Sequence, residues 1–172
     1  MLEYLLLLLV GLVVGVINTL AGSGSAIILP VLMFFGLPAG IANATNRLGI
    51  LFQTGVSTFS FYQKGLLKKS YFTGYVFPSF IGAICGAYLA SISSDELIRN
   101  VITFVILAVL ISSFLFWVLA PKSKIHSPVY LSIYINFILF YLIGIYGGYI
   151  QIGLGLLVIG VLHFWLGRNL TE

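Results

Sequence analysis

The stretch that decides the fold is LLLLLVGLVVGVINTLAGSGSAIILPVLMFF, which covers residues 5–35 and carries no charge. Two apolar segments, 4–20 and 26–37, flank a piece that is rich in glycine and small hydroxyl side chains. Such residues weaken a helix and expose backbone amides. In a bilayer, irregular backbone persists only where it is buried in protein or lines a cavity. The stretch therefore indicates a broken helix beside a cavity, while a tight loop at the membrane surface is the alternative.

Charged residues are scarce throughout the chain. Of 172 residues, eight are Lys or Arg and four are Asp or Glu, so charged residues make up 7% and apolar residues 60%. A soluble domain carries about a quarter of charged residues. The long uncharged runs instead suit spanning helices, which need about 20 apolar residues each. The composition excludes a soluble enzyme, a nucleic-acid binder and a disulfide-rich secreted domain.

Glycine, proline and polar clusters divide the chain into about seven hydrophobic segments. Their bounds are 4–20, 26–37, 42–62, 71–91, 97–119, 128–151 and 154–167. The second and the seventh are short for a complete span, so tilted helices and re-entrant halves both remain open. We predict an all-α polytopic membrane protein.

The charges between the segments sort by side. One set of connections carries only lysines, at positions 64, 68, 69, 122 and 124. The other side carries Glu3, Asp95 and Glu96, together with Arg47 and Arg99. By the positive-inside rule the lysine side is cytoplasmic, which puts the N-terminus outside. This assignment requires the second segment to cross the membrane fully.

An internal repeat is visible when the chain is shifted by 133 residues. The shift places Gly11, Gly15, Asn18 and Gly22 on Gly144, Gly148, Gln151 and Gly155. After a two-residue slip, 34–36 falls on 165–167. The matching segments are the first and the sixth, so the copies would enter the membrane from opposite sides, as in inverted-repeat transporters. The predicted organisation is a first repeat over 1–120, a cytoplasmic loop over 121–127 and an incomplete second repeat over 128–172.

A second polar group, Ala42-Asn43-Ala44-Thr45-Asn46-Arg47, opens the third segment. The planar fork of arginine suits oxyanions because it donates two parallel hydrogen bonds; a surface-facing helix cap is the alternative for Arg47. Polar residues then continue on one helix face through Gln53 and Ser57. Such a stripe faces a water-filled path or holds helices together.

In the fourth segment, small residues at four-residue spacing lie on one helix face, which predicts close helix packing. They are Gly74, Pro78, Gly82, Gly86 and Ala90.

Groups for catalysis are missing from the sequence. No carboxylate lies inside a predicted span, which argues against an intramembrane metal site. The chain has no G-x-x-x-x-G-K-S/T motif and no close Ser/His/Asp set. We therefore predict neither an enzyme nor a cofactor nor a metal ion. His163 is open to two interpretations, a proton relay and a capped or interfacial histidine.

Three motifs resemble the TauE/SafE family of sulfite and organosulfur-anion exporters. They are the glycine-rich run 15–25, Leu29-Pro30 with Gly36-Leu37-Pro38, and the Asn-rich run 42–49. The resemblance implies a multi-pass transporter of small anions in the bacterial plasma membrane. It also implies substrate-binding positions at Asn18, Gly22, Gly24, Asn43, Asn46 and Arg47. The glycine-rich run, the polar stripe and the repeat add Ser23, Gln53 and Gln151.

Two departures from the family pattern shape the functional hypotheses. This chain has Ser23 and Ser25 where the family has nearly pure glycine, and a second Asn-rich motif is expected just after Glu172. We therefore expect a truncated member, or a bundle that a second copy or a second chain completes. The first hypothesis is an anion transporter that binds an oxyanion at the broken-helix amides and Arg47. The alternative is a non-transporting fragment or partner subunit of a split membrane protein.

Overall fold

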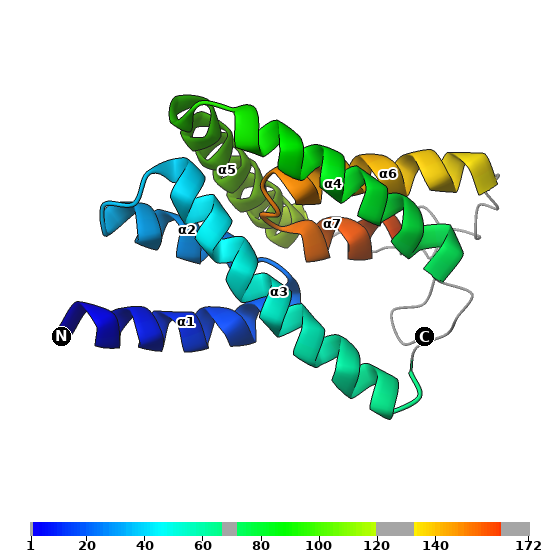
Figure 1. The fold of residues 1–172 in the computed structure, drawn as a ribbon, viewed down its shortest axis with the longest axis horizontal. Coiled ribbons are helices and arrows are strands. Elements are labelled where there is room, and N and C mark those ends of the chain that lie inside the picture. Colours follow the sequence, from blue (N-terminus) through cyan, green and yellow to red (C-terminus); the bar gives the residue numbers. More distant parts are fainter. Residues whose placement is uncertain (1, 67–71, 120–132, 163–172) are drawn as a thin grey trace.

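The computed structural model describes residues 2–66, 72–119 and 133–162, and every structural statement below concerns these residues. They form helices that pack into one bundle (Figure 1). The elements are α1 (Leu2–Ala21), α2 (Ser25–Phe34), α3 (Ala39–Gln63), η1 (Phe72–Val76), α4 (Phe77–Ile92), α5 (Asp95–Leu119), α6 (Ile133–Tyr149) and α7 (Leu154–Gly160). The prediction of an all-α fold is confirmed.

Two of the helices are interrupted where the sequence is rich in glycine. α1 ends at Ala21 and α2 begins at Ser25, with Gly22 in the left-handed conformation at φ 64°. α6 ends at Tyr149 and α7 begins at Leu154. The stretch that was predicted to break a helix therefore does so, and a second break separates α6 from α7.

The helices differ in how much of a bilayer they can cross. In the described ranges, one helix, Gly74–Ile92, is long and apolar enough for a complete span. The shorter apolar helices are Leu5–Leu20, Ser25–Phe34 and Tyr134–Tyr149. At 1.5 Å per residue α2 rises about 15 Å, half of a hydrocarbon core of about 30 Å. The charge-based topology required this segment to cross fully, so the outside position of the N-terminus stays a prediction, as do the seven spans and the repeat.

Some features of the predicted topology lie outside the described residues. They are the lysines at 68, 69, 122 and 124, the loop 121–127, and His163.

α4 and α6 pack against each other through glycines. A Cβ atom built on Gly82 would lie 2.1 Å from the carbonyl oxygen of Tyr141, and one on Gly86 would lie 2.0 Å from that of Ile145. Gly148 on α6 shows the same geometry toward Ala83, at 2.1 Å. Small residues let two helix backbones approach this closely, as they do in membrane helix pairs. The small-residue face predicted for the fourth segment is therefore a packing face at Gly82 and Gly86, whereas a Cβ atom on Gly74 would meet no atom within 4 Å.

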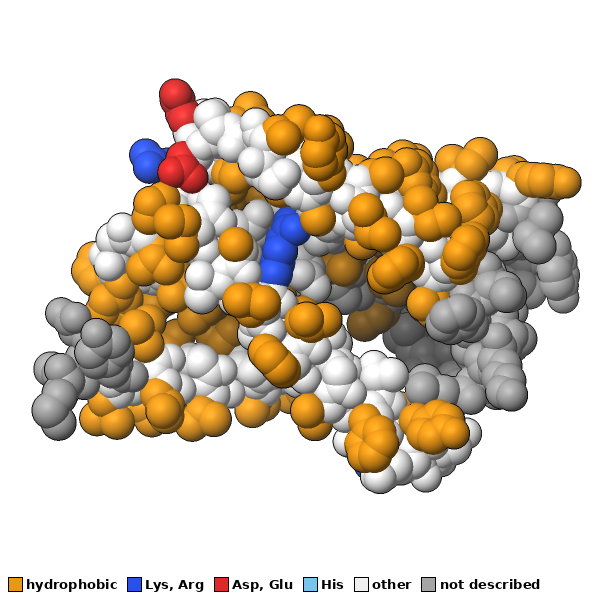
Figure 2. Space-filling model, in the orientation of Figure 1, with side chains coloured by type: hydrophobic (Ala, Val, Ile, Leu, Met, Phe, Trp, Pro, Cys, Tyr) orange, Lys and Arg blue, Asp and Glu red, His pale blue; other side chains and the backbone are white. Residues whose placement is uncertain are grey.

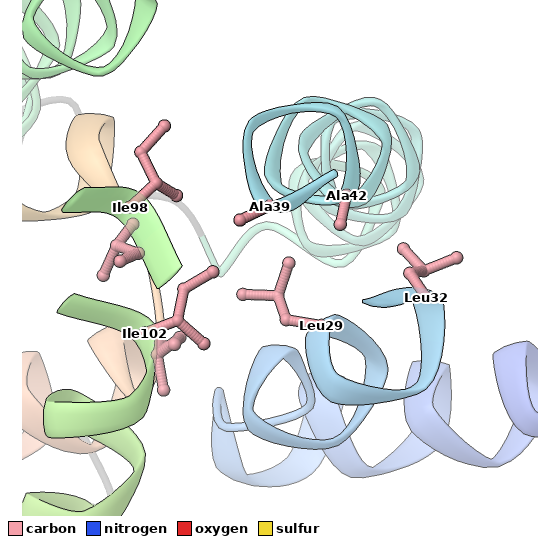
Figure 3. Packing of buried hydrophobic residues seen from close by; sticks show 8 residues of the cluster. Leu29, Leu32, Ala39, Ala42, Ile98 and Ile102 are labelled. Atoms are coloured by element: carbon pink, nitrogen blue, oxygen red, sulfur yellow. The ribbon is translucent and has the colours of Figure 1, made fainter. Parts of the chain in front are cut away.

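One hydrophobic core joins three helices to the second helix break. Its buried members come from α2, α3, α5 and the chain just after α6, and several are shown in Figure 3; they are Leu29, Leu32, Ala39, Ala42, Ile98, Ile102, Ile150 and Ile152. At the edge of this core, Asp95 Oδ1 accepts a hydrogen bond of 2.8 Å from the backbone N–H of Gly40, which joins the starts of α3 and α5. Figure 2 shows charged side chains at the same end.

Hydrophobic side chains are spread over the face of the molecule that Figure 2 shows. Phe34 is 88% exposed, Phe52 74% and Tyr62 71%. Apolar side chains at this density would be unfavourable in water, whereas lipid tails solvate them. The outer surface therefore fits a protein that is surrounded by lipid.

Candidate functional site

A cavity of about 380 Å³ lies where the two helix breaks meet the middle of α3. Its polar lining is neutral, because no charged residue belongs to it within the described ranges. Polar side chains come from all three elements, and aliphatic side chains cover the rest. The lining residues are Asn18, Thr19, Leu20, Gly22, Ile50, Thr54, Gln151, Leu154, Gly155, Val158 and Ile159.

The two breaks touch each other at the wall of this cavity. The backbone N–H of Gly155 donates a hydrogen bond of 3.4 Å to the carbonyl oxygen of Gly22. A Cβ atom built on Gly22 would lie 2.4 Å from the Cα atom of Gly155. Together with its left-handed φ, this approach makes glycine the residue that fits position 22. Gly22 and Gly155 are also the residues that the 133-residue shift pairs.

Asn18 bridges the first break. Its Oδ1 accepts a hydrogen bond of 3.2 Å from the backbone N–H of Gly24, on the far side of the break. Its Nδ2 donates to Gln53 Oε1 at 3.0 Å. Gln53 Nε2 in turn donates to the carbonyl oxygen of Gly15 at 2.9 Å and to Thr19 Oγ1 at 2.6 Å. Gln53 therefore fixes the end of α1 against α3, and it orients the two polar residues that α1 contributes to the cavity.

Asn46 and Ser25 form a buried pair behind the cavity. Asn46 Nδ2 donates to Ser25 Oγ at 3.0 Å, and the two residues are 8% and 1% exposed. Buried polar side chains need such partners because an unsatisfied group loses its hydration without compensation. The pair ties α3 to the first residue of α2 and so sets where the helix restarts.

Asn43 and Arg47 meet the end of α6. Asn43 Nδ2 donates to the carbonyl oxygen of Tyr149 at 3.0 Å, and Arg47 Nη2 donates to the same oxygen at 2.5 Å. The last carbonyls of a helix lack partners within the helix and carry partial negative charge. A guanidinium is therefore well placed there. The hydroxyl of Tyr149 also lies 3.0 Å from Ser93 Oγ, which ties the end of α6 to the end of α4.

Gln151 occupies an unusual backbone conformation in the second break. At φ 61° it is the one non-glycine residue with positive φ in the described ranges. Its neighbours Ile150 and Ile152 are fully buried in the core, whereas Gln151 itself lines the cavity. Strained residues of this kind persist only where the surroundings hold them, and they gather at functional sites.

Comparison with known proteins gives the family. A family model described as sulfite exporter TauE/SafE matches residues 7–172. The chain belongs to the TauE/SafE family. It is also similar to the "Probable membrane transporter protein ORF9" of Sinorhizobium sp., with 29% identity over 97 residues. This match covers 56% of the chain and 37% of that relative. No solved structure matches the chain.

The TauE/SafE resemblance read from the three motifs is thus confirmed, and it makes the chain a member of a family of bacterial membrane transporters. The motif residues take different places in the structure. Asn18, Gly22 and Gln151 line the cavity, whereas Gln53 and Gly24 contact Asn18. Ser23 accepts from the N–H of Ala26 in the first turn of α2. Their roles as substrate ligands stay predictions.

Two cavity residues with polar side chains were not among the predicted site residues. Thr19 and Thr54 each follow a predicted residue directly and contribute a hydroxyl to the lining. The hydroxyl of Thr19 donates to the carbonyl oxygen of Gly15 at 2.9 Å, and that of Thr54 donates to the carbonyl of Ile50 at 2.8 Å. In the sequence, the only indication that these threonines line the cavity was that they directly follow Asn18 and Gln53.

Proposed function

We propose that this chain is a multi-pass transporter of small anions, either sulfite or organosulfonates, and that the anion binds in the cavity between the helix breaks. The observation that carries the proposal is the lining itself, which contains the side-chain amides of Asn18, in the last turn of α1 before the first break, and of Gln151, inside the second break. Irregular backbone within a membrane is tolerated where it lines a cavity. Membership of the TauE/SafE family supports the same function.

The neutral lining suits an anion that must also leave. Side-chain amides donate hydrogen bonds to oxyanions without adding a fixed counter-charge, whereas the hydroxyls of Thr19 and Thr54 already donate to backbone carbonyls. Arg47 is one helical turn from Ile50, which lines the cavity, so its positive charge favours an anion nearby. A site must bind well enough to admit its substrate and weakly enough to release it.

The aliphatic part of the lining favours organosulfonates. Leu20, Leu154 and Val158 face the same cavity as the polar side chains. A sulfonate group would bind at the amides while its carbon chain packs against these residues, removing apolar surface from water. Bare sulfite would use the polar part alone, so we expect organosulfonates to compete with sulfite.

Alternating access would separate the two breaks. The contact between Gly22 and Gly155 is one long hydrogen bond plus close backbone packing. In repeat-built transporters one half rocks against the other around a fixed site. Movement of α6–α7 relative to α1–α2 would open the cavity at this contact.

The test is flux in proteoliposomes that contain the purified chain. We expect uptake of radiolabelled sulfite, inhibited by short alkylsulfonates, and a roughly tenfold or greater loss in Gln151→Ala because a hydrogen bond to a charged group is removed. Gly11→Ala is the matched control, since a Cβ atom there meets no atom within 4 Å. Wild-type flux that Gln151→Ala leaves unchanged would place the substrate elsewhere.

A second candidate function is that of a subunit that contributes helices to a larger transporter. The observation that favours it is α3, where polar Thr58 and apolar Phe52 and Phe59 are exposed in the same region. Polar side chains of membrane helices usually face protein or water. Flux through vesicles that contain this chain alone would rule the subunit out. Flux that needs a second chain would support it.

A further inference from the structure

We propose that Asn43 and Arg47 are positioning residues, which hold the end of α6 so that Gln151 faces the cavity, and are not ligands of the anion. The inference rests on the proposed function only in taking the cavity as the place where Gln151 acts. Its structural part is that α3 fixes the strained turn that follows α6 and contains Gln151. That part can be measured without any transport.

The first step is the shared acceptor. Two side chains one turn apart on α3 donate to a single carbonyl oxygen, that of Tyr149, which is the last residue of α6. Neither donor residue belongs to the cavity lining. The Nε atom of Arg47 and the Oδ1 atom of Asn43 are buried and have no partner in the described part of the chain. Their polar atoms are thus directed at α6 or enclosed beside it.

The second step leads from Tyr149 to Gln151. The two residues are separated only by Ile150, which is fully buried in the core. The hydroxyl of Tyr146, one turn earlier on α6, donates to the carbonyl oxygen of Ile152 and so closes the turn from the other side. By contrast, the backbone N–H of Gln151 reaches the carbonyl oxygen of Tyr146 only at 3.5 Å. The turn is therefore held at its flanks, and Gln151 itself contributes little to its stability.

The third step explains why an arginine serves here. The carboxyl end of a helix attracts a cation, and a charged donor makes a stronger hydrogen bond than a neutral one. The guanidinium keeps its charge under all ordinary conditions, and its planar shape fixes the direction of its donors. Lysine would keep the charge but lose the fixed direction. Without either cation, the left-handed conformation of Gln151 would lose one of the contacts that maintain it.

The test uses a cysteine reporter in the cavity. The chain has a single cysteine, Cys85, so Cys85→Ser gives a cysteine-free background in one step. Gln151→Cys is then labelled with a small methanethiosulfonate reagent in detergent micelles, and Thr54→Cys serves as a second reporter on another wall of the cavity. We expect Arg47→Ala to change the labelling rate at position 151 by about tenfold, as fits loss of a charged hydrogen bond. The rate at position 54 should stay the same.

Matched variants define the outcome. Asn43→Ala should shift the rate at position 151 in the same direction and by less, because its hydrogen bond is neutral. Arg47→Lys should be labelled at position 151 at a rate closer to the wild type than that of Arg47→Ala, because lysine keeps the charge although it loses the fixed direction. Arg99→Ala removes an exposed arginine from α5 and should have no effect.

The alternatives give different results. If Arg47 were only an anion ligand, Arg47→Ala would abolish flux and leave labelling at position 151 unchanged, which would overturn the inference. Equal changes at positions 151 and 54 would indicate general unfolding and would also overturn it. A change confined to position 151 supports positioning. If the wild-type chain then shows no flux, the proposed function fails while the positioning role stands.

Discussion

Replacing Gly22 with alanine tests whether the two helix breaks depend on direct backbone contact. Gly22 has φ 64°, and a built Cβ atom would lie 2.4 Å from the Cα atom of Gly155 and 2.9 Å from its nitrogen. Gly65 has nearly the same conformation, φ 66°, but a Cβ atom there meets nothing within 4 Å. Gly65→Ala is therefore a control in which the backbone penalty is the same and the contact is absent.

The size of the effect follows from these two terms. Alanine in the left-handed conformation costs about 1 kcal/mol, which applies to both variants. Carbon atoms pack at about 3.5–4.0 Å, so the breaks must separate by about 1 Å in Gly22→Ala alone. That shift takes the hydrogen bond between Gly155 and Gly22, 3.4 Å long, out of range. Overpacking of this kind adds about 1–3 kcal/mol.

Thermal unfolding in detergent micelles measures the difference. For a chain of this length each kcal/mol lowers the melting temperature by about 2–4 °C. Gly65→Ala should therefore melt about 2–4 °C below the wild type, and Gly22→Ala roughly 5–15 °C below it. If the two variants melt at the same temperature, the contact between the breaks contributes nothing and the reasoning is refuted.

Two further variants test packing and strain in the same assay. Gly148→Ala places a Cβ atom 2.1 Å from the Ala83 carbonyl oxygen, so its melting temperature should fall by several °C. Gly11→Ala has open space, and its melting temperature should match or exceed that of the wild type because alanine favours helix. Equal losses in the two variants would argue against close α4–α6 packing. Gln151→Gly should stay within about 0.5 kcal/mol of the wild type, since relief of the left-handed strain offsets the greater entropy of unfolded glycine. Gln151→Val should be less stable than both, and a stable valine variant would contradict the strain.

Hydropathy and glycine content were sufficient to predict much of the helical layout. Apolar runs marked the helices because each must present apolar side chains to lipid or to its neighbours. The run with Gly22 and Gly24 marked the first break, since glycine both weakens helix and permits positive φ. The small residues on the fourth segment marked its packing face, where a larger side chain would collide with the α6 backbone.

The contacts of the polar residues could not be predicted in the same way. Arg47 and Tyr149 are 102 residues apart, and the acceptor is a backbone carbonyl, a group that every residue carries. A side-chain pattern can therefore reveal the donor but not its partner. The left-handed conformation of Gln151 was equally hidden, because glutamine has no preference for it and the contacts that hold the turn come from tertiary structure.

The inverted repeat stays a prediction, and the geometry of the breaks supports it. Each break contains one glycine in the left-handed conformation shortly before a helix restarts, Gly22 at φ 64° and Gly153 at φ 66°. A shift of 133 residues pairs Gly22 with Gly155. The shift of 131 residues that applies after the two-residue slip would pair Gly22 with Gly153, which lies in the second break. Equivalent residues contact each other only beside a twofold axis. If the repeat is inverted, its axis therefore runs between Gly22 and Gly155, through the cavity that both residues line.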